Sequence, residues 1–363
     1  MFKEIVKYGE AEVMYKNKEL LSQKPKLYNL FWETTLRCNA KCKHCGSRAG
    51  ENCNLKDELT TEEIKKALQS VANKYKASDI LLNITGGEPL IREDLFDVMN
   101  FAKNLGYRWG MTTNGILIND DIIQKMNDTN MTTISISLDG LGKTHDDFRG
   151  VPGSYEKIIE NIKKLKKANF LVCLQVTTVV NKSNINELED MYKVIKDLNL
   201  DSWRVVNMDP IGRANDNSNL ALDKDDYKYL FDFIKDKRKK SKFDVTYGCS
   251  HFLGFKYEKE VRGNMFFCIS GFTTASILYN GDIFVCPNVE RRKELIQGNI
   301  RTDDFVDVWE NKYTWFRDLD KFKCGDCEKC EDWKYCRGDS LHTWDFEKNQ
   351  PKLCLNKILK GDV

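Results

Sequence analysis

The chain has 363 residues, of which 41% are hydrophobic and 31% charged, and its formal net charge is only +2. A chain of this length and composition can bury a sizeable core and form about two domains, which excludes a disordered or low-complexity protein. The near-neutral balance provides no overall field that would gather nucleic acid, so we expect no nucleic-acid partner.

Residues 1–26 are predicted to form an N-terminal extension. They are charged throughout and lack the apolar stretch of a signal peptide. The longest mainly apolar run of the whole chain, Phe170 to Val180, is too short to span a bilayer. We therefore expect a soluble, cytoplasmic protein that does not bind membranes.

Residues 27–240 alternate between β-rich runs and segments of helical period, which predicts parallel strands joined by crossover helices. Strands are expected at Leu27–Thr35, Asp79–Thr85, Tyr107–Thr112, Thr132–Leu138, Phe170–Val180 and Ser202–Met208. Helices are expected at Thr61–Tyr75, Glu93–Leu105, Asp120–Asn127, Ser154–Ala168, Ile185–Leu198 and Lys224–Lys240. Six such units fall short of a closed eight-unit barrel, so the fold class is α/β, either a partial (β/α)6 TIM-like barrel or an open doubly wound sheet.

Unusual residues follow each predicted strand, where parallel α/β folds bind their ligands. They are Cys38, Cys42 and Cys45, then Gly86, Gly87 and Glu88, then Asn114, Asp139, Asn181, Asp209 and Arg213. These side chains are expected to meet at one site. By strand-end position Asp139, Asp209 and Arg213 are candidates for catalytic acid or base, with Asp209 retained as the leading one.

Residues 241–363 lack the regular alternation and are predicted to form a second, small α+β domain. Eight of the thirteen cysteines lie here, from Cys249 onward. The pair Asn280-Gly281 between two short β-rich runs predicts a hairpin that ends just before Cys286. An odd number of cysteines without a secretion signal favours metal binding or redox chemistry over disulfides.

Cys38, Cys42 and Cys45 supply three thiolates within eight residues. Three ligands suffice for an iron–sulfur cube with one iron left open, whereas structural zinc requires four. His44 is the alternative fourth zinc ligand, but its place between two of the cysteines makes tetrahedral coordination awkward.

This Cys-x3-Cys-x2-Cys motif after a first strand resembles the signature of the radical S-adenosylmethionine (radical SAM) superfamily. The resemblance implies a SAM site formed by Gly86, Gly87, Glu88, Asn114, Ser137, Asp139 and Arg149. Arg149 lies in an HDxxRG stretch typical of peptide-modifying members, where it either binds the SAM carboxylate or forms a salt bridge that orders the loop. The implied chemistry is reductive cleavage of SAM to a 5′-deoxyadenosyl radical that abstracts hydrogen from a substrate.

The cysteine-rich tail resembles the SPASM extension of this superfamily, which houses two auxiliary 4Fe–4S clusters. By that resemblance Cys249, Cys268 and Cys286 bind the first, and Cys327, Cys330, Cys336 and Cys354 bind the second. Ser340 stands where the family usually has a further cysteine, so the fourth site of the first cluster is left to Cys324, His342 or an open iron. A zinc knuckle at Cys324, Cys327 and Cys330 is the alternative. The cofactors implied are SAM and three 4Fe–4S clusters.

The leading hypothesis is an enzyme that modifies a peptide or small protein by crosslinking, thioether formation, epimerisation or oxidation. Its electron donor would be a flavodoxin or ferredoxin, and Cys53 is a candidate hydrogen-atom donor if the reaction is an epimerisation. One alternative is dehydrogenation of a Ser or Cys side chain, as in anaerobic sulfatase maturation, although Ser340 weighs against it. The alternative from another class is a zinc-bearing binding scaffold.

Overall fold

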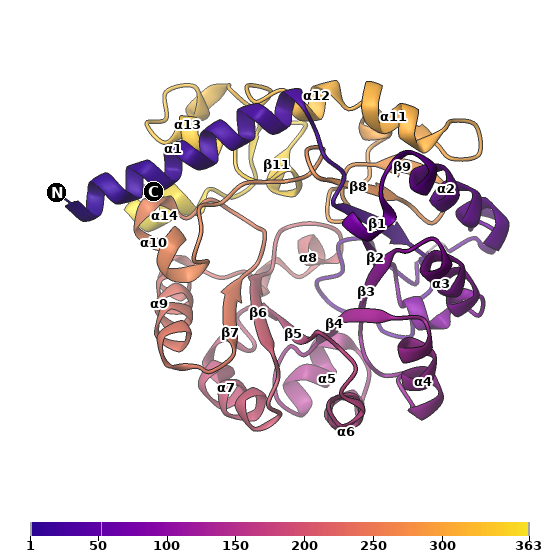
Figure 1. Cartoon of the computed structure of the whole chain (residues 1–363). Helices are drawn as coiled ribbons and strands as arrows, with labels where there is room; N and C mark the ends of the chain where they lie inside the picture. Colours follow the sequence, from indigo (N-terminus) through magenta and orange to yellow (C-terminus); the bar gives the residue numbers. More distant parts are fainter. Residues whose placement is uncertain (1, 52, 362–363) are drawn as a thin grey trace.

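The computed structural model describes residues 2–51 and 53–361, in which a ten-stranded sheet surrounds the centre of the molecule (Figure 1). Six strands correspond to the predicted ones: β1 (Asn29–Glu33), β2 (Leu81–Thr85), β3 (Arg108–Thr113), β4 (Met131–Ser137), β5 (Cys173–Val180) and β6 (Ser202–Asn207). They are parallel and pair in chain order. A doubly wound sheet would reverse this order at its middle. The partial TIM-like barrel is therefore confirmed.

Helices cover the outer surface of this strand ring (Figure 1). They are α2 (Thr61–Lys74), α3 (Leu95–Asn104), α4 (Asp120–Asp128), α5 (Lys143–Arg149), α6 (Ser154–Ala168), α7 (Leu188–Asp197) and α9 (Lys224–Lys240), whereas the short helix α8 (Arg213–Asp216) lies over the middle of the ring. Helix α2 begins with a capping box, in which Thr60 accepts from the Glu63 N–H and Glu63 accepts from the Thr60 N–H. The short helices α5 and α8 follow β4 and β6 and were not predicted.

The outer faces of the strands form the core, whereas polar side chains line the inside of the barrel. On β1 Leu30 and Trp32 are fully buried in the core cluster. Inside, Ser135 of β4 shares a hydrogen bond of 2.7 Å with Thr177 of β5, and Arg204 Nε of β6 donates to Thr177 Oγ1 at 3.2 Å. Such an interior can hold a polar ligand rather than only side-chain packing.

The sheet continues beyond residue 240. Strand β7 (Asp244–Tyr247) pairs with β6, and β8 (Thr274–Ile277) pairs in parallel with β1. Strands β8 and β9 (Asp282–Phe284) form an antiparallel pair joined by Asn280-Gly281, as predicted, and β10 (Gly298–Asn299) pairs with β9. Gly281 has φ +90°, which the turn requires. The cysteine-rich segment is thus joined to the barrel by backbone hydrogen bonds.

The N-terminal extension is a helix, α1 (Phe2–Gln23), which lies along the C-terminal segment (Figure 1). It contacts α12 (Thr314–Arg317) and α13 (Trp333–Cys336). The other elements of this segment are α10 (Gly254–Val261), α11 (Phe305–Asn311), β11 (Trp344–Asp345), β12 (Gln350–Pro351) and α14 (Leu355–Lys360). Within residues 2–51 and 53–361, no helix has both the length and the apolar character needed to cross a bilayer.

Candidate functional site

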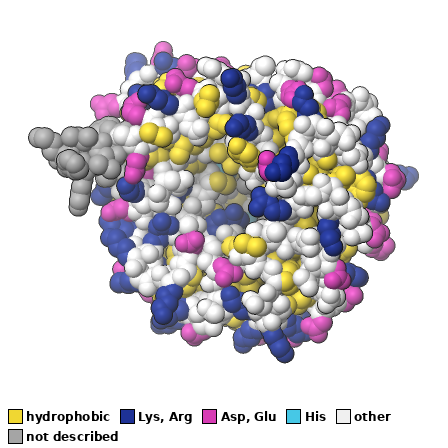
Figure 2. Space-filling view, in the orientation of Figure 1, with side chains coloured by type: hydrophobic (Ala, Val, Ile, Leu, Met, Phe, Trp, Pro, Cys, Tyr) yellow, Lys and Arg dark blue, Asp and Glu magenta, His cyan; other side chains and the backbone are white. Residues whose placement is uncertain are grey.

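A cavity of about 560 Å³ lies at the carboxyl ends of the strands. Its lining includes many of the predicted site residues: Cys38, Cys42, Cys45, Gly86, Gly87, Asn114, Ser137, Arg149, Asp209 and Cys249. Residues 287–291 of the C-terminal segment line the same cavity. Figure 2 shows a hollow over the middle of the strand ring, with Lys and Arg side chains around it. The strand-end motifs of the barrel therefore meet at one site, together with part of the cysteine-rich segment.

The loop that carries Cys38 is held against the Gly86-Gly87 turn. The Gly87 N–H donates to Thr35 O at 2.7 Å, and the Glu88 N–H donates to Arg37 O at 2.8 Å. A Cβ atom on Gly87 would lie 2.1 Å from Arg37 O, so this approach requires glycine. The two motifs thus form one rigid wall of the cavity.

The three thiols of the first motif have the surroundings that an iron–sulfur cluster needs. Arg149 Nη1 donates to Cys42 Sγ at 3.5 Å, and the Ala49 N–H donates to Cys45 Sγ at 3.4 Å. Burial raises the pKa of Cys38 to about 11, so this thiol loses its proton readily only when a metal binds to the sulfur. Among the residues that the structure describes, no three His, Cys, Asp or Glu side chains converge on a point for one ion. A four-iron cluster binds its thiolates through different irons and so fits this wider arrangement.

His44 offers the cavity a polar atom. Its ring stacks on Phe148 with centroids 4.8 Å apart, and within the described part of the chain its buried Nδ1 has no hydrogen-bond partner. Burial lowers the pKa of His44 to about 3, so the ring is neutral at physiological pH. A buried polar atom without a partner indicates a polar ligand, and the amine, carboxylate, ribose or adenine of SAM can supply its partner.

Glu88 is fully buried and points to the protein rather than to the cavity. Its carboxylate accepts hydrogen bonds from Thr113 Oγ1 and from the Asn114 N–H, each at 2.8 Å. Burial raises its pKa. The resemblance assigns Glu88 to the SAM site, and in this structure its carboxylate ties the end of β2 to the end of β3.

Asp139 and Arg149 form a buried ion pair, with Nε and Oδ2 2.5 Å apart. Burial alone would raise the pKa of Asp139, but Arg149 lowers it overall. Of the two, only Arg149 lines the cavity. Its guanidinium orders the α5 loop through Asp139 and at the same time lies beside Cys42.

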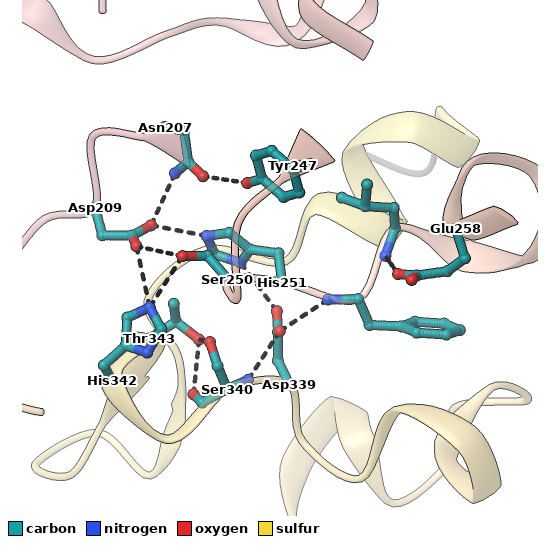
Figure 3. Close-up of polar contacts among 12 residues, drawn as sticks. Asn207, Asp209, Tyr247, Ser250, His251, Glu258, Asp339, Ser340, His342 and Thr343 are labelled. Atoms are coloured by element: carbon teal, nitrogen blue, oxygen red, sulfur yellow. Dashed lines mark hydrogen bonds and ion pairs between the residues drawn. The ribbon is translucent and has the colours of Figure 1, made fainter. Parts of the chain in front are cut away.

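A network of acidic and imidazole side chains connects the end of β6 to the C-terminal segment (Figure 3). Asp209 accepts from His251 Nε2 at 2.8 Å and from Ser250 Oγ at 3.1 Å, and it lies 3.2 Å from His342 Nε2. His251 Nδ1 lies 3.0 Å from Asp339 Oδ2. Burial would lower the pKa of His251, but Asp339 and Asp209 raise it to about 10. His251 is therefore an imidazolium that donates from both nitrogens.

Sequence reasoning missed His251, Asp339 and Arg204. The only sequence signal for His251 is its place two residues after Cys249, and Asp339 stands 88 positions from its partner His251. Arg204 lines the cavity and donates to the Thr177 hydroxyl, but among the described residues it forms no ion pair with a carboxylate. The other arginines of the cavity, Arg48, Arg149, Arg213 and Arg291, all pair with Asp or Glu.

The C-terminal cysteines form two groups. In the first group, Cys249, Cys268 and Cys286 influence one another electrostatically. In the second group, Cys327, Cys330 and Cys354 do the same, and Cys354 also influences Cys336. Burial raises the pKa of Cys286 and of Cys327 to about 12. These groups match the two predicted ligand sets, which remain predictions.

The three candidates for the fourth ligand of the first auxiliary cluster are distinguished by their positions. The Cys327 N–H donates to Cys324 O at 3.0 Å, and the Cys324 thiol acts on the pKa of Cys327, so Cys324 lies beside the second group. His342 Nε2 is engaged by Asp209 and by Ser250. This placement favours the open iron over either side chain.

Cys53 and Cys173 do not line the cavity. Cys53 Sγ donates to Leu36 O at 3.1 Å, in the loop beyond the first motif. Cys173 is the first residue of β5 and is half-buried. The structure thus gives Cys53 no direct access to a substrate in the cavity.

Two family models match the chain: the radical SAM superfamily at residues 32–195 and the SPASM iron–sulfur cluster-binding domain at residues 268–331. An AdoMet-dependent heme synthase of Methanosarcina barkeri is 30% identical and covers 88% of this chain and 94% of that protein. The mycofactocin maturase MftC of Mycobacterium tuberculosis is 26% identical over 86% of this chain and 78% of that protein.

Among solved structures, anSMEcpe with bound AdoMet superimposes with a TM-score of 0.72 at 20% identity and covers 93% of this chain and 91% of that chain. Streptococcus suis SuiB bound to S-adenosylmethionine gives a TM-score of 0.67 at 18% identity and covers 86% of this chain and 73% of that chain. At these identities the likeness confirms the fold alone. The two family models and the enzyme relatives remove the alternative of a zinc-bearing binding scaffold.

Proposed function

The chain belongs to the radical SAM superfamily and carries a C-terminal SPASM domain, and on this premise we propose that it modifies a peptide or small protein held in the cavity. The observation that carries the proposal is the composition of the cavity wall. Cys38, Cys42 and Cys45 line it together with residues 287–291 of the C-terminal segment. A substrate there would touch both the site of radical formation and the cysteine-rich domain.

The residues suited to hold the cofactors are those already placed at the cavity. Cys38, Cys42 and Cys45 would bind the first 4Fe–4S cluster. When SAM is bound, this cluster would supply the electron for reductive cleavage of the carbon–sulfur bond at the sulfonium. Gly86, Gly87, Asn114 and Ser137 line the region where SAM would lie. Arg149 contributes positive charge beside Cys42.

The proposed peptide substrate is supported by the maturase relatives. MftC is named as the maturase of mycofactocin, and its match spans most of both chains. Two arginines at the cavity suit a polar chain. Arg204 lacks a carboxylate partner among the described residues, and Arg213 Nε orders the Cys42 loop by donating to the carbonyl oxygen of Cys42 at 2.8 Å. An acidic side chain of the substrate would complement Arg204.

A heme precursor is the second candidate substrate. It is favoured by the relative from Methanosarcina barkeri, which is more similar in sequence than the maturase and is named a heme synthase. The guanidinium of Arg204, which pairs with no carboxylate among the described residues, also suits a carboxylate-bearing precursor of this kind. Dehydrogenation of a Ser or Cys side chain is less favoured, because Ser340 replaces the cysteine that this reaction type is expected to use.

Anaerobically reconstituted protein, supplied with SAM and dithionite, tests the proposal. We expect 5′-deoxyadenosine to form and a small protein encoded beside the gene to change in mass. A parallel incubation with Fe-coproporphyrin III, the compound named in the Fe-coproporphyrin III synthase of Methanosarcina barkeri, a relative 27% identical over 65% of this chain, tests the second candidate by its absorption spectrum and mass. The Cys42→Ala variant is the control and should release no 5′-deoxyadenosine. Turnover of the porphyrin with no mass change in any neighbouring small protein would replace the peptide proposal by the second.

A further inference from the structure

Two lysines lie between the two groups of C-terminal cysteines. Lys18 of α1 is only 1% exposed, and Lys321 follows α12 in the C-terminal segment. Within residues 2–51 and 53–361 neither lysine forms an ion pair with a carboxylate: Lys18 Nζ donates to Tyr335 O at 2.5 Å, and Lys321 Nζ donates to Asp318 O at 3.0 Å. A buried ammonium group without an anionic partner is unfavourable, so an anion is expected near Lys18.

Thiols are the acidic groups that act on both lysines, beside the carboxylates of Glu258 for Lys18 and Asp318 for Lys321. A small cavity is lined by Lys321 together with Cys268 of the first group and Cys336 of the second. The thiolates of Cys336 and Cys268 both favour the charged form of Lys18, and Cys268 does so for Lys321. Burial lowers the pKa of each lysine to about 8, and the neighbouring thiolates oppose this lowering.

Aromatic rings complete the surroundings of both ammonium groups. Lys18 Nζ lies 4.8 Å from the centre of the Phe267 ring, next to Cys268 in the chain, and Lys321 Nζ lies 5.2 Å from that of Phe322. Rings hold a cation in place without neutralising it. Each positive charge is therefore left free to act on the neighbouring thiolates.

We propose that Lys18 and Lys321 compensate the negative charge of the auxiliary clusters at Cys268 and Cys336 and thereby raise the reduction potentials of these clusters. This inference rests on the part of the proposed function that assigns clusters to these cysteines. Reduction adds a negative charge to a cluster that three or four thiolates already make anionic, and a fixed nearby cation stabilises the reduced form more than the oxidised one. The N-terminal helix α1 then contributes to the redox site of a domain more than 200 residues away in the chain.

The test is an EPR-monitored redox titration of the reconstituted full-length protein and of its Lys18→Met and Lys321→Met variants. We expect the midpoint potential of at least one auxiliary cluster to fall in each variant. The expected change is at least tenfold in the ratio of reduced to oxidised cluster at a fixed potential, about 59 mV for a one-electron couple. Lys16→Met, which removes an exposed lysine of the same helix, is the matched control and should leave the potentials unchanged.

Iron and sulfide are counted in every sample. These counts separate a failure of the proposed lysine role from a failure of the cluster assignment. About twelve irons in the parent protein, with unshifted potentials in both lysine variants, would overturn the role of the lysines and leave the cluster assignment intact. About four irons in the parent would overturn the assignment of auxiliary clusters and this inference with it. If Lys18→Met does not fold, Lys321→Met decides, since Lys321 is only half-buried and lines the same cavity.

Discussion

His251 donates a hydrogen bond of 2.8 Å from Nε2 to Asp209, which lies just beyond the end of strand β6 (Figure 3). His251 follows β7, and its second nitrogen meets Asp339 of the C-terminal segment at 3.0 Å. One protonated ring thus joins the barrel to the cysteine-rich domain at the wall of the cavity. The bridge explains how a loop that carries Cys249 is fixed next to Asp209.

Replacing His251 by Asn should destabilise the protein by about 3–5 kcal/mol, because Asp209 and Asp339 would face each other without the cation between them. The shift of the denaturant midpoint measures this loss. His342→Asn is the matched control, since it removes only one of the contacts of Asp209 and should cost no more than about 1.5 kcal/mol. Equal effects of the two substitutions would contradict the bridging role of His251.

Arg149→Lys should reduce SAM cleavage at least tenfold, because a lysine carries the charge but cannot reach Asp139 and Cys42 together. Release of 5′-deoxyadenosine measures the effect, and the iron content shows whether the first cluster is still formed. Lys143→Met, at an exposed position of the same helix α5, serves as the control. Unchanged cleavage in Arg149→Lys would show that the ion pair with Asp139 does nothing beyond ordering the loop.

Cys324→Ser should leave the iron content near that of the parent protein, whereas Cys330→Ser should lose up to about four irons per chain. The reason is that Cys324 lies beside the second cysteine group, which already has four candidate ligands without it. Iron and sulfide analysis after anaerobic reconstitution measures both variants. A matching loss in Cys324→Ser would identify Cys324 as a ligand.

Glu63→Gln should lower the free energy of unfolding at pH 7 by up to about 1 kcal/mol, because it removes an ion pair with Arg301 and keeps the helix cap of α2. The Arg301 hydrogen bond lowers the pKa of Glu63 to about 2. A folded-state pKa below the unfolded one stabilises the protein above pH 4.5, and this contribution is lost as the pH falls toward 2.

Unfolding of the metal-free protein at pH 7 and pH 3 tests this pH dependence. The difference between Glu63→Gln and the parent protein should shrink at the lower pH. Glu62→Gln, at the exposed neighbouring position, should show a smaller effect at both. A difference that grows toward pH 3 would contradict the assigned direction.

The sequence alone determined the local elements and the first cysteine motif. The six central strands and the helices α6 and α9 are where the pattern predicted them, because apolar periodicity and capping residues act over a few neighbouring positions. The Asn280-Gly281 hairpin was predictable for the same reason. The strand-end rule also placed Cys38, Gly87 and Asp209 correctly at one cavity, since parallel strands align their carboxyl ends.

Tertiary structure decided what depends on residues far apart in the chain. The pairing of β8 with β1, the bridge from Asp209 through His251 to Asp339, and the burial of Lys18 against the C-terminal segment join positions tens to hundreds of residues apart. Burial and electrostatics arise only when such positions meet, and no local pattern encodes them. The sequence therefore predicted many of the residues that meet at the cavity, whereas the fold decided which charges surround them.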